Sequence, residues 1–251
     1  MLHLYKKIKR FIPKGIIKLF KKNEELSRSF ISIPYIGNKY FCNICNFRMS
    51  EFVKLENHDQ LCPKCGSLGR TRRLWSLLEN ETQGKKILHF SPSKSLKKKL
   101  DSLDDIEHIT TDYLGEFEAM KKLNIESIDE PNEEYDLIIC FHVLEHIEND
   151  TMAMEELLRI LKQGGMCIIQ TPFKVGEIYE NDAIKTDEER LIHFGQEDHL
   201  RIYSVEGLMN RLRNAGFKTR LLEYNENKNN RNGYSIDEKI ILAEKPVSNK
   251  E

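Results

Sequence analysis

The sequence predicts an α/β protein, in which a small cysteine-rich module precedes a doubly wound, mostly parallel sheet of seven strands. Two observations predict this class. From residue 85 onward, apolar runs of strand length alternate with amphipathic stretches of helix length, as in a parallel sheet covered by helices on both faces. Before residue 67, two CxxC pairs stand 16 residues apart. The 251 residues are enough for one sizeable domain and one small module.

Residues 1–22 form a basic amphipathic segment. They carry eight basic side chains and no acidic one, with apolar residues at helical spacing that Pro13 and Gly15 interrupt. Such a segment is typical of contact with an anionic membrane surface. A helix packed on its own domain, or a frayed tail with solvated lysines, explains the same pattern.

The rest of the chain is acidic. Without those eight residues, 31 basic side chains remain against 40 acidic ones, a net charge of about −9 that argues against nucleic acid as a partner. No apolar run reaches the roughly 20 residues of a membrane span, and no secretory signal is recognisable. The paired cysteines favour a reducing compartment, so we expect a cytoplasmic protein with peripheral contact at the inner face of the membrane through residues 1–22.

Residues 40–66 contain the predicted metal site. Two CxxC pairs at this spacing can bring four thiolates together in the tetrahedral geometry that Zn²⁺ prefers, and a site made of four cysteines is structural. Cys140 and Cys167 lie inside apolar strands and are expected to be small core side chains. The predicted zinc ligands are Cys42, Cys45, Cys62 and Cys65.

The remaining elements follow from periodicity. Residues 67–84 are expected to be a connecting segment whose helix, 70–80, ends before Gly84, and the main domain spans 85–246. Apolar residues at helical spacing predict further helices over 93–103, 150–165 and 204–217. Apolar runs bounded by turn residues predict strands over 85–90, 106–113, 121–128, 135–141, 166–172, 218–224 and 239–246. The last two strands flank an Asn-rich loop and are expected to form an antiparallel hairpin at one edge.

Polar side chains gather where the predicted parallel strands end, which is where open α/β sheets bind ligands. The segments are "HFSPS", "TTDY", "LNIES", "CFHVLEHI" and "TPF". Together with "CPKCGSLGRTRRLW", "LKQGGMCIIQTP" and "HFGQEDHLRIY", they resemble class I S-adenosylmethionine-dependent methyltransferases, and most closely a bacterial type 11-like subgroup with a zinc-ribbon-like unit before the domain. The resemblance covers about residues 40–245 and implies a Rossmann-like methyltransferase fold.

The resemblance also implies roles for individual residues. Asp112 matches the carboxylate that binds the ribose hydroxyls of S-adenosylmethionine, while Asn124 and Ile125 match the segment at its adenine edge. Most relatives have an acid at the position of Asn124. The remaining implied cofactor contacts are Phe90, Ser91, Pro92, Phe141, His142 and Glu145. For Glu145, an N-terminal helix cap explains the residue as well.

The segment 193–203 is expected to line the acceptor side, because it concentrates polar side chains in the insertion after the fifth strand. Methyl transfer to a hydroxyl is helped by a base, and His199 beside Asp198 is the predicted catalytic pair. The predicted acceptor-binding residues are His146, His193, Gln196, Arg201 and Tyr203. The expected reaction is O-methylation of a small molecule or of a sugar in surface glycan biosynthesis.

Two alternatives stay open at this stage. The first is an RNA methyltransferase that uses Arg70, Arg72 and Arg73 to hold phosphates, although the acidic body argues against it. The second is a catalytically inactive scaffold, because the loop after the first strand, "HFSPSKS", lacks the glycines that let a backbone approach the cofactor closely.

Overall fold

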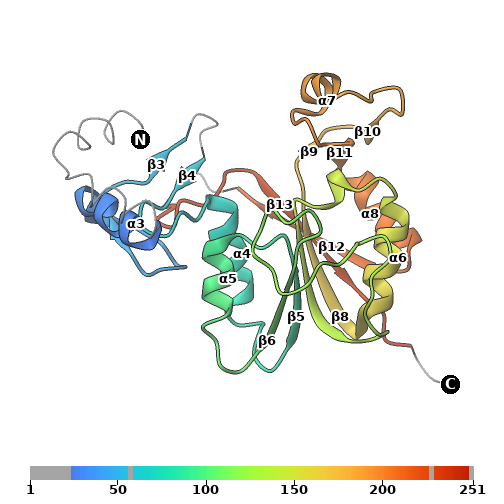
Figure 1. Cartoon of the computed structure of the whole chain (residues 1–251), viewed down its shortest axis with the longest axis horizontal. Coiled ribbons are helices and arrows are strands. Elements are labelled where there is room, and N and C mark those ends of the chain that lie inside the picture. The colour runs from blue at the N-terminus through green and yellow to red at the C-terminus, as the bar shows by residue number, and fades with distance from the viewer. Residues whose placement is uncertain (1–23, 56–58, 226–228, 249–251) are drawn as a thin grey trace. The chain divides into compact units, whose positions relative to one another are not determined.

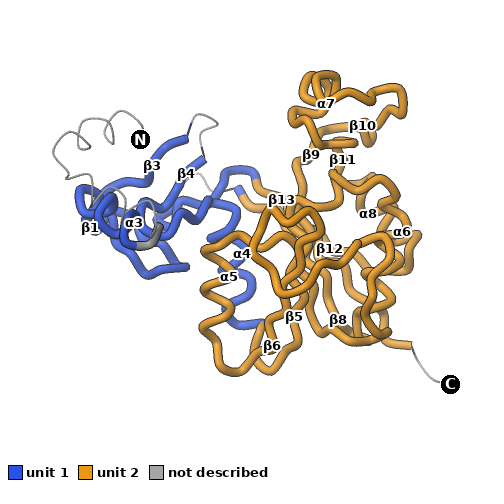
Figure 2. The backbone as a smooth tube through the Cα atoms, viewed as in Figure 1, with its two compact units in different colours: residues 1–81, 225–237 blue, residues 82–224, 238–251 orange. Residues whose placement is uncertain are grey.

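The structure is a computed structural model that describes residues 24–55, 59–225 and 229–248. The predicted basic segment 1–22 lies outside these residues. The chain divides into two compact units, shown in Figure 2: unit 1 comprises Met1–Glu81 and Asn225–Asp237, and unit 2 comprises Thr82–Tyr224 and Glu238–Glu251.

Unit 1 contains short strands around the two cysteine pairs. Its elements are the helices α3 (Glu24–Ser32), η1 (Ile33–Tyr35) and α4 (Gly69–Leu78) and the strands β1 (Ile36–Phe41), β2 (Arg48–Met49), β3 (Val53–Lys54) and β4 (Gln60–Leu61). β1 pairs with β2 and β3 with β4, both antiparallel, so each CxxC pair follows a strand of a small hairpin. α4 matches the expected helix 70–80 and buries Leu74, Trp75 and Leu78.

The Asn-rich loop 225–237 belongs to unit 1, although it is far from the cysteine pairs in sequence. The amide of Phe41 donates to the carbonyl of Arg231 (2.8 Å), and the side-chain amide of Asn232 donates to the carbonyl of Phe41 (3.1 Å). Gly233 has φ +59°, and a Cβ there would meet the ring of Phe52 at 2.3 Å, so only glycine fits. The loop therefore completes the core of the small unit.

Unit 2 is built on a six-stranded sheet in the order β12-β13-β8-β7-β5-β6, shown in Figure 1. Its strands are β5 (Lys86–Phe90), β6 (Glu107–Thr111), β7 (Tyr135–Phe141), β8 (Leu161–Gln170), β12 (Lys218–Tyr224) and β13 (Glu238–Glu244). β6, β5, β7 and β8 are parallel, while β13 runs antiparallel to both β8 and β12. The predicted doubly wound sheet and its antiparallel hairpin are confirmed.

The prediction of a seventh strand over 121–128 is wrong. Among the described residues this segment makes only isolated bridges, one of them between Lys121 and Thr111. Its backbone bonds to side chains instead: the amide of Leu123 donates to Thr111 Oγ1 (3.0 Å), and that of Ile128 to Glu156 Oε2 (2.6 Å). The apolar side chains of the segment are buried as a strand's would be, which explains the misleading pattern.

The helices of unit 2 cover the sheet. They are α5 (Lys94–Leu100), η2 (Leu144–His146), α6 (Asp150–Ile160), α7 (Asp187–Phe194) and α8 (Val205–Asn214). α6 ends five residues earlier than predicted, because Leu161 is buried as the first residue of β8. The register of β8 against β7 then shifts between Leu161 and Met166, where Gly164 turns with φ +74°.

An insertion between β8 and α8 forms a separate small sheet. It contains β9 (Phe173–Lys174), β10 (Tyr179–Glu180), α7 and β11 (Arg201–Ser204), with β11 between β10 and β9. Figure 1 shows this insertion standing away from the main sheet, beyond the end of β8.

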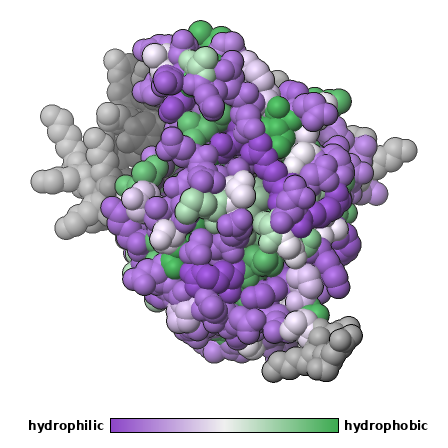
Figure 3. All heavy atoms as spheres, turned by 90° about the vertical axis from the view of Figure 1, so that its right-hand side faces the viewer, coloured by the Kyte–Doolittle hydropathy of each residue, from purple (hydrophilic) through white to green (hydrophobic). Residues whose placement is uncertain are grey.

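The molecular face seen in Figure 3 is mostly hydrophilic, with hydrophobic side chains in small separate groups. A search of the described residues finds no helix with the length and apolar character needed to cross a membrane.

Candidate active site and metal centre

The four predicted zinc ligands come together in unit 1. The Sγ atoms of Cys42 and Cys65 are 3.6 Å apart, and those of Cys45 and Cys62 are 3.8 Å apart. Four sulfurs around a tetrahedral Zn²⁺ at about 2.3 Å would be separated by roughly 3.8 Å, so the spacing fits the ion. All four thiols are free of disulfides. The cluster therefore supports a structural zinc site.

The two CxxC pairs fold in the same way. The amide of Asn46 donates to the carbonyl of Cys42 (2.8 Å), and the amide of Gly66 donates to the carbonyl of Cys62 (2.9 Å). Both turn residues have positive φ, +57° at Asn46 and +75° at Gly66. Asparagine and glycine are the residues that adopt this conformation most readily, so the local sequence specifies both turns.

Arg72 is the polar centre of unit 1 and is completely buried. Its guanidinium donates to four backbone carbonyls, those of Gln60 (2.9 Å), Ser67 (2.5 Å), Asn232 (2.5 Å) and Gly233 (2.5 Å). Burial lowers its pKa, although the nearby cysteine sulfurs act in the opposite direction. Arg72 thus ties the cysteine unit to the loop 225–237.

This placement corrects the interpretation of the three arginines as phosphate contacts. Arg73 is only 4% exposed and its guanidinium lies 3.9 Å from the ring centroid of Tyr234. Arg70 is the partly exposed one, with Nη1 3.7 Å from Asp59 Oδ2. Two of the three arginines are therefore core residues.

In unit 2, the chain turns sharply at the ends of two adjacent strands. Ser91 follows β5 with φ +44°, and His142 follows β7 with φ +54°. Phe90, directly before Ser91, is paired in register with Cys140, which lies two residues before His142. Positive φ is uncommon outside glycine, and such strain clusters at functional sites. Ser91 thereby supplies the turn that a glycine was expected to provide.

Asp112, directly after β6, points its carboxylate toward this turn. Its Oδ1 accepts from Ser91 Oγ (3.0 Å), and its Oδ2 accepts from the amides of Glu116 (2.7 Å) and Phe117 (3.2 Å). The residue is 7% exposed. A carboxylate has about four acceptor positions, so at least one remains for a ligand.

The other predicted cofactor residues lie around the same strand ends. Phe90, Pro92 and Ile125 are buried, and Phe141 is half-buried at the end of β7. Asn124 Oδ1 accepts from the amide of Glu126 (3.0 Å), which makes a local turn. Their contacts with a cofactor stay predictions.

Buried polar atoms without a hydrogen-bond partner gather at the ends of β7 and β8. The atoms in this region are His142 Nε2, Gln170 Oε1 and Thr171 Oγ1. The amide of His142 donates to the carbonyl of Gln170 (2.8 Å), which holds the two strand ends together. Since buried polar groups are nearly always paired, these atoms are available to a polar ligand.

The segment after β7 brings the ionisable side chains of His142 and Glu145 close together. His142 Nδ1 lies 3.1 Å from Glu145 Oε1, and Glu145 is 1% exposed. Burial alone would raise the pKa of Glu145, but the hydrogen bond and charge of His142 outweigh it and the pKa is lowered. Glu145 is therefore a buried carboxylate. Its Oε1 bonds to the neighbouring His142, and its contact with a cofactor stays a prediction.

The predicted pair of His199 and Asp198 is not present as such. Asp198 Oδ2 lies 3.0 Å from His146 Nδ1, so the exposed carboxylate orients His146 instead. His199 is 2% exposed and packs its ring edge-on against His146, with the centroids 4.7 Å apart. Burial lowers the pKa of His199, with the nearby His146 adding to the effect. His199 and Asp198 therefore both contact His146 and not each other's side chain as a pair.

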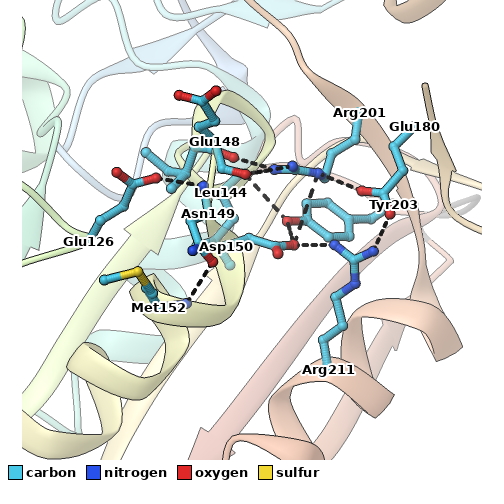
Figure 4. Close-up of polar contacts among 11 residues, drawn as sticks. Glu126, Leu144, Glu148, Asn149, Asp150, Met152, Glu180, Arg201, Tyr203 and Arg211 are labelled. Atoms are coloured by element: carbon cyan, nitrogen blue, oxygen red, sulfur yellow. Dashed lines mark hydrogen bonds and ion pairs between the residues drawn. The ribbon is translucent and has the colours of Figure 1, made fainter. Parts of the chain in front are cut away.

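Arg201 and Tyr203 hold this segment in place, as Figure 4 shows. Arg201 donates to the carbonyls of Ile147 and Glu148, and Tyr203 Oη donates to Asp150 Oδ2 (2.5 Å). Arg201 is 7% exposed and Tyr203 is fully buried. We therefore replace the expectation that they bind the acceptor with a positioning role for the segment 144–150.

The contacts that hold the segment 144–150 also involve residues that the sequence did not single out. Arg211 on α8 bonds to Asp150 Oδ2 (2.5 Å) and to Glu180, and Glu180 Oε2 also accepts from Arg201 Nε (3.0 Å). These contacts join α6, α8 and β10, which are distant in sequence. Only the acidic start of the helix at Asp150 carried a local signal.

The remaining predicted acceptor residues, His193 and Gln196, are exposed at the end of α7. His193 Nδ1 lies 2.7 Å from Tyr179 Oη. α7 begins at a capping box of Thr186 and Glu189 and ends at Gly195, with φ +86°. His193 therefore stands in the last turn of a short, well-capped helix of the insertion, and Gln196 follows its C-cap.

Comparison with known families agrees with this geometry. Residues 69–222 match the sequence model of a family described as "Methyltransferase domain". The chain belongs to this methyltransferase family. The match spans α4 and most of unit 2, including β5–β8 and the insertion. No curated protein matches the chain.

Solved structures show the same fold. A SAM dependent methyltransferase from Archaeoglobus fulgidus is 17% identical, with 70% of this chain and 92% of that chain covered and a TM-score of 0.50. The YcgJ protein from Bacillus subtilis is 15% identical, covering 70% and 98%, with a TM-score of 0.48. A 1,6-didemethyltoxoflavin-N1-methyltransferase from Burkholderia thailandensis is 14% identical, covering 70% and 76%, with a TM-score of 0.46. The family match and the structure from Archaeoglobus fulgidus confirm the expected class I methyltransferase fold.

The strand ends of this methyltransferase fit the cofactor that the fold implies. Asp112 keeps a free acceptor position for a hydroxyl, and the unpaired atoms at His142 and Gln170 could bond to the polar amino-acid end of S-adenosylmethionine. The turn at Ser91 replaces the absent glycine loop. The donor set is thus compatible with the cofactor.

Proposed function

We propose that this methyltransferase uses S-adenosylmethionine to methylate a hydroxyl group of a small molecule or of a sugar in a surface glycan. The observation that carries the proposal is the cluster of imidazoles and carboxylates directly after β7, beside the strand ends that fit the cofactor. Class I methyltransferases place the acceptor on this side of the sheet.

When bound, the cofactor supplies a methyl group on a positively charged sulfur, and the chain's residues hold both reactants. Asp112 would accept from the ribose hydroxyls, while Asn124 and Ile125 would lie along the adenine. The loop 90–92, together with Phe141 and His142, would contact the methionine part. Such positioning is the main source of acceleration in a direct transfer.

The acceptor would approach His146, His193 and Gln196, which are the predicted acceptor residues with exposed or half-buried side chains. Asp198 fixes the orientation of the His146 ring, so that Nε2 is the nitrogen left to meet the acceptor. His199 packs behind that ring. The cluster is thus suited to handle the proton that the hydroxyl loses.

The placement of the arginines weakens the RNA alternative, because Arg72 and Arg73 are buried in unit 1. The scaffold alternative depends on the glycine-free loop, and the turn at Ser91 removes much of its basis. The scaffold alternative predicts no cofactor binding, and the RNA alternative predicts a different class of acceptor.

The test combines calorimetry with S-adenosylmethionine and a screen of acceptors with radiolabelled cofactor. We expect cofactor binding and label transfer to hydroxylated small molecules or to lipid-linked or free glycan sugars. Absence of cofactor binding would leave the scaffold, and transfer confined to RNA would leave the RNA alternative. Asp112→Asn serves as the binding-deficient control.

A further inference from the structure

Glu145, His146 and His199 bring three metal-ligating groups together beyond the end of β7. One ligand atom from each side chain lies within 4.8 Å of the other two. They come from two segments: Glu145 and His146 belong to η2, while His199 lies just before β11. The backbone fixes this arrangement, because the amide of Leu200 donates to the carbonyl of Glu145 (2.8 Å).

Two of the three groups are buried and have a polar atom that forms no hydrogen bond with the described residues. Glu145 Oε2 and His199 Nε2 have no hydrogen-bond partner among the described residues, and the two residues are 1% and 2% exposed. Leaving a buried polar atom unpaired destabilises the folded state, and the effect is larger for a charged group. Two such atoms within one cluster point to a ligand that pairs with both.

Each group is also held by its second polar atom. His146 Nδ1 lies 3.0 Å from Asp198 Oδ2, and Glu145 Oε1 lies 3.1 Å from His142 Nδ1. The imidazole of His199 bonds to the backbone of Phe194, which leaves Nε2 free. Histidines that ligate metals almost always have their other nitrogen fixed by a carboxylate or a carbonyl in this way.

We propose that Glu145, His146 and His199 bind one divalent transition metal ion, such as Zn²⁺. Two imidazoles and one carboxylate form a donor set used by catalytic zinc sites, which keep a further position open for water or substrate. Ligands of a tetrahedral ion at about 2.1 Å are separated by roughly 3.4 Å, so atoms that lie within 4.8 Å of one another need only a small adjustment to bind one ion.

The role of this ion rests on the proposed function. An acceptor hydroxyl that occupies the open position has a lowered pKa and releases its proton to solvent water. An oxygen lone pair then forms the new C–O bond to the methyl carbon. The C–S bond of the sulfonium breaks with its electron pair staying on sulfur, which leaves a neutral thioether. In this state His146 acts as a ligand and not as the base.

The experiment measures zinc alone, without methyl transfer, in equilibrium dialysis of the full chain stripped of metal. The wild type should bind two equivalents, one at the four cysteines and one at this cluster. His199→Asn should bind one equivalent, and His193→Asn, which changes a histidine outside the cluster, should still bind two. Titration with Co²⁺ separates the sites, because only the cysteine site gives thiolate charge-transfer bands.

Because His199 is buried, a second variant guards against misfolding. Asp198→Asn removes an exposed carboxylate that orients His146, and it should weaken the second equivalent by about 10–100-fold. A wild type that saturates at one equivalent with thiolate bands, or a His199→Asn protein that retains two, would overturn the site. A protein with two equivalents and no methyl transfer would keep the metal site and refute the proposed function.

Discussion

Replacement of Asp112 by asparagine tests the cofactor site most directly. In the structure, one carboxylate oxygen accepts from Ser91 Oγ, and the other accepts from the amides of Glu116 and Phe117. Asparagine keeps one oxygen for the two amides, and its NH₂ group can donate to Ser91 Oγ. The loop is therefore expected to keep its conformation, while the charged acceptor for the ribose hydroxyls is lost.

The expected size follows from the bonds that are lost. Hydrogen bonds to a charged group contribute about 1.5–3 kcal/mol each, so losing the ribose contact should weaken S-adenosylmethionine binding by roughly 10–150-fold. At a cofactor concentration of 100 times the wild-type Kd, the wild type gains about 2.7 kcal/mol of stability. A variant that binds about 30-fold more weakly gains only about 0.9 kcal/mol at the same concentration.

Calorimetry gives the affinity, and thermal unfolding with and without cofactor gives the gain in stability. Ser91→Ala is the matched control: it removes the hydroxyl that donates to Asp112 but keeps the carboxylate, so its affinity should fall by only a few-fold. If Asp112→Asn binds the cofactor as tightly as the wild type while its own stability is unchanged, Asp112 is not the ribose ligand.

Three further predictions concern other parts of the chain. Cys62→Ser should lose one equivalent of zinc by elemental analysis and lower the melting temperature of unit 1, with S-adenosylmethionine affinity unchanged; metal-free wild type would refute the zinc site. Burial lowers the pKa of His89 to about 3. Below pH 6.5 the imidazole of His89 is therefore protonated in the unfolded chain but stays neutral in the native state. Urea unfolding should therefore show stability falling as pH drops from 6.5 to 5, by about 1–2 kcal/mol more in the wild type than in His89→Leu; parallel curves would contradict this. The intact chain should float with anionic liposomes at low salt and a chain lacking residues 1–22 should not, while neutral liposomes capture neither; equal flotation would leave the segment as a packing helix.

The sequence by itself determined the fold class and the zinc ligands, because both depend on signals that are local in the chain. Alternation of apolar strands with amphipathic helices predicts the parallel sheet, and the two CxxC pairs carry the residues that their turns require. The false strand at 121–128 shows the limit of such patterns: Leu123 and Ile125 are buried, but the amide of Leu123 donates to the side chain of Thr111 and not to a strand backbone.

Only the tertiary structure decided which polar residues meet. Asp198 is next to His199 in sequence but orients His146. Arg201 and Tyr203 are buried and hold the segment 144–150 through hydrogen bonds. Periodicity predicts whether a side chain is buried, but it does not predict which residue becomes its hydrogen-bond or ion-pair partner. The partner depends on where the chain returns after tens of residues, and packing fixes that place once many elements fold together.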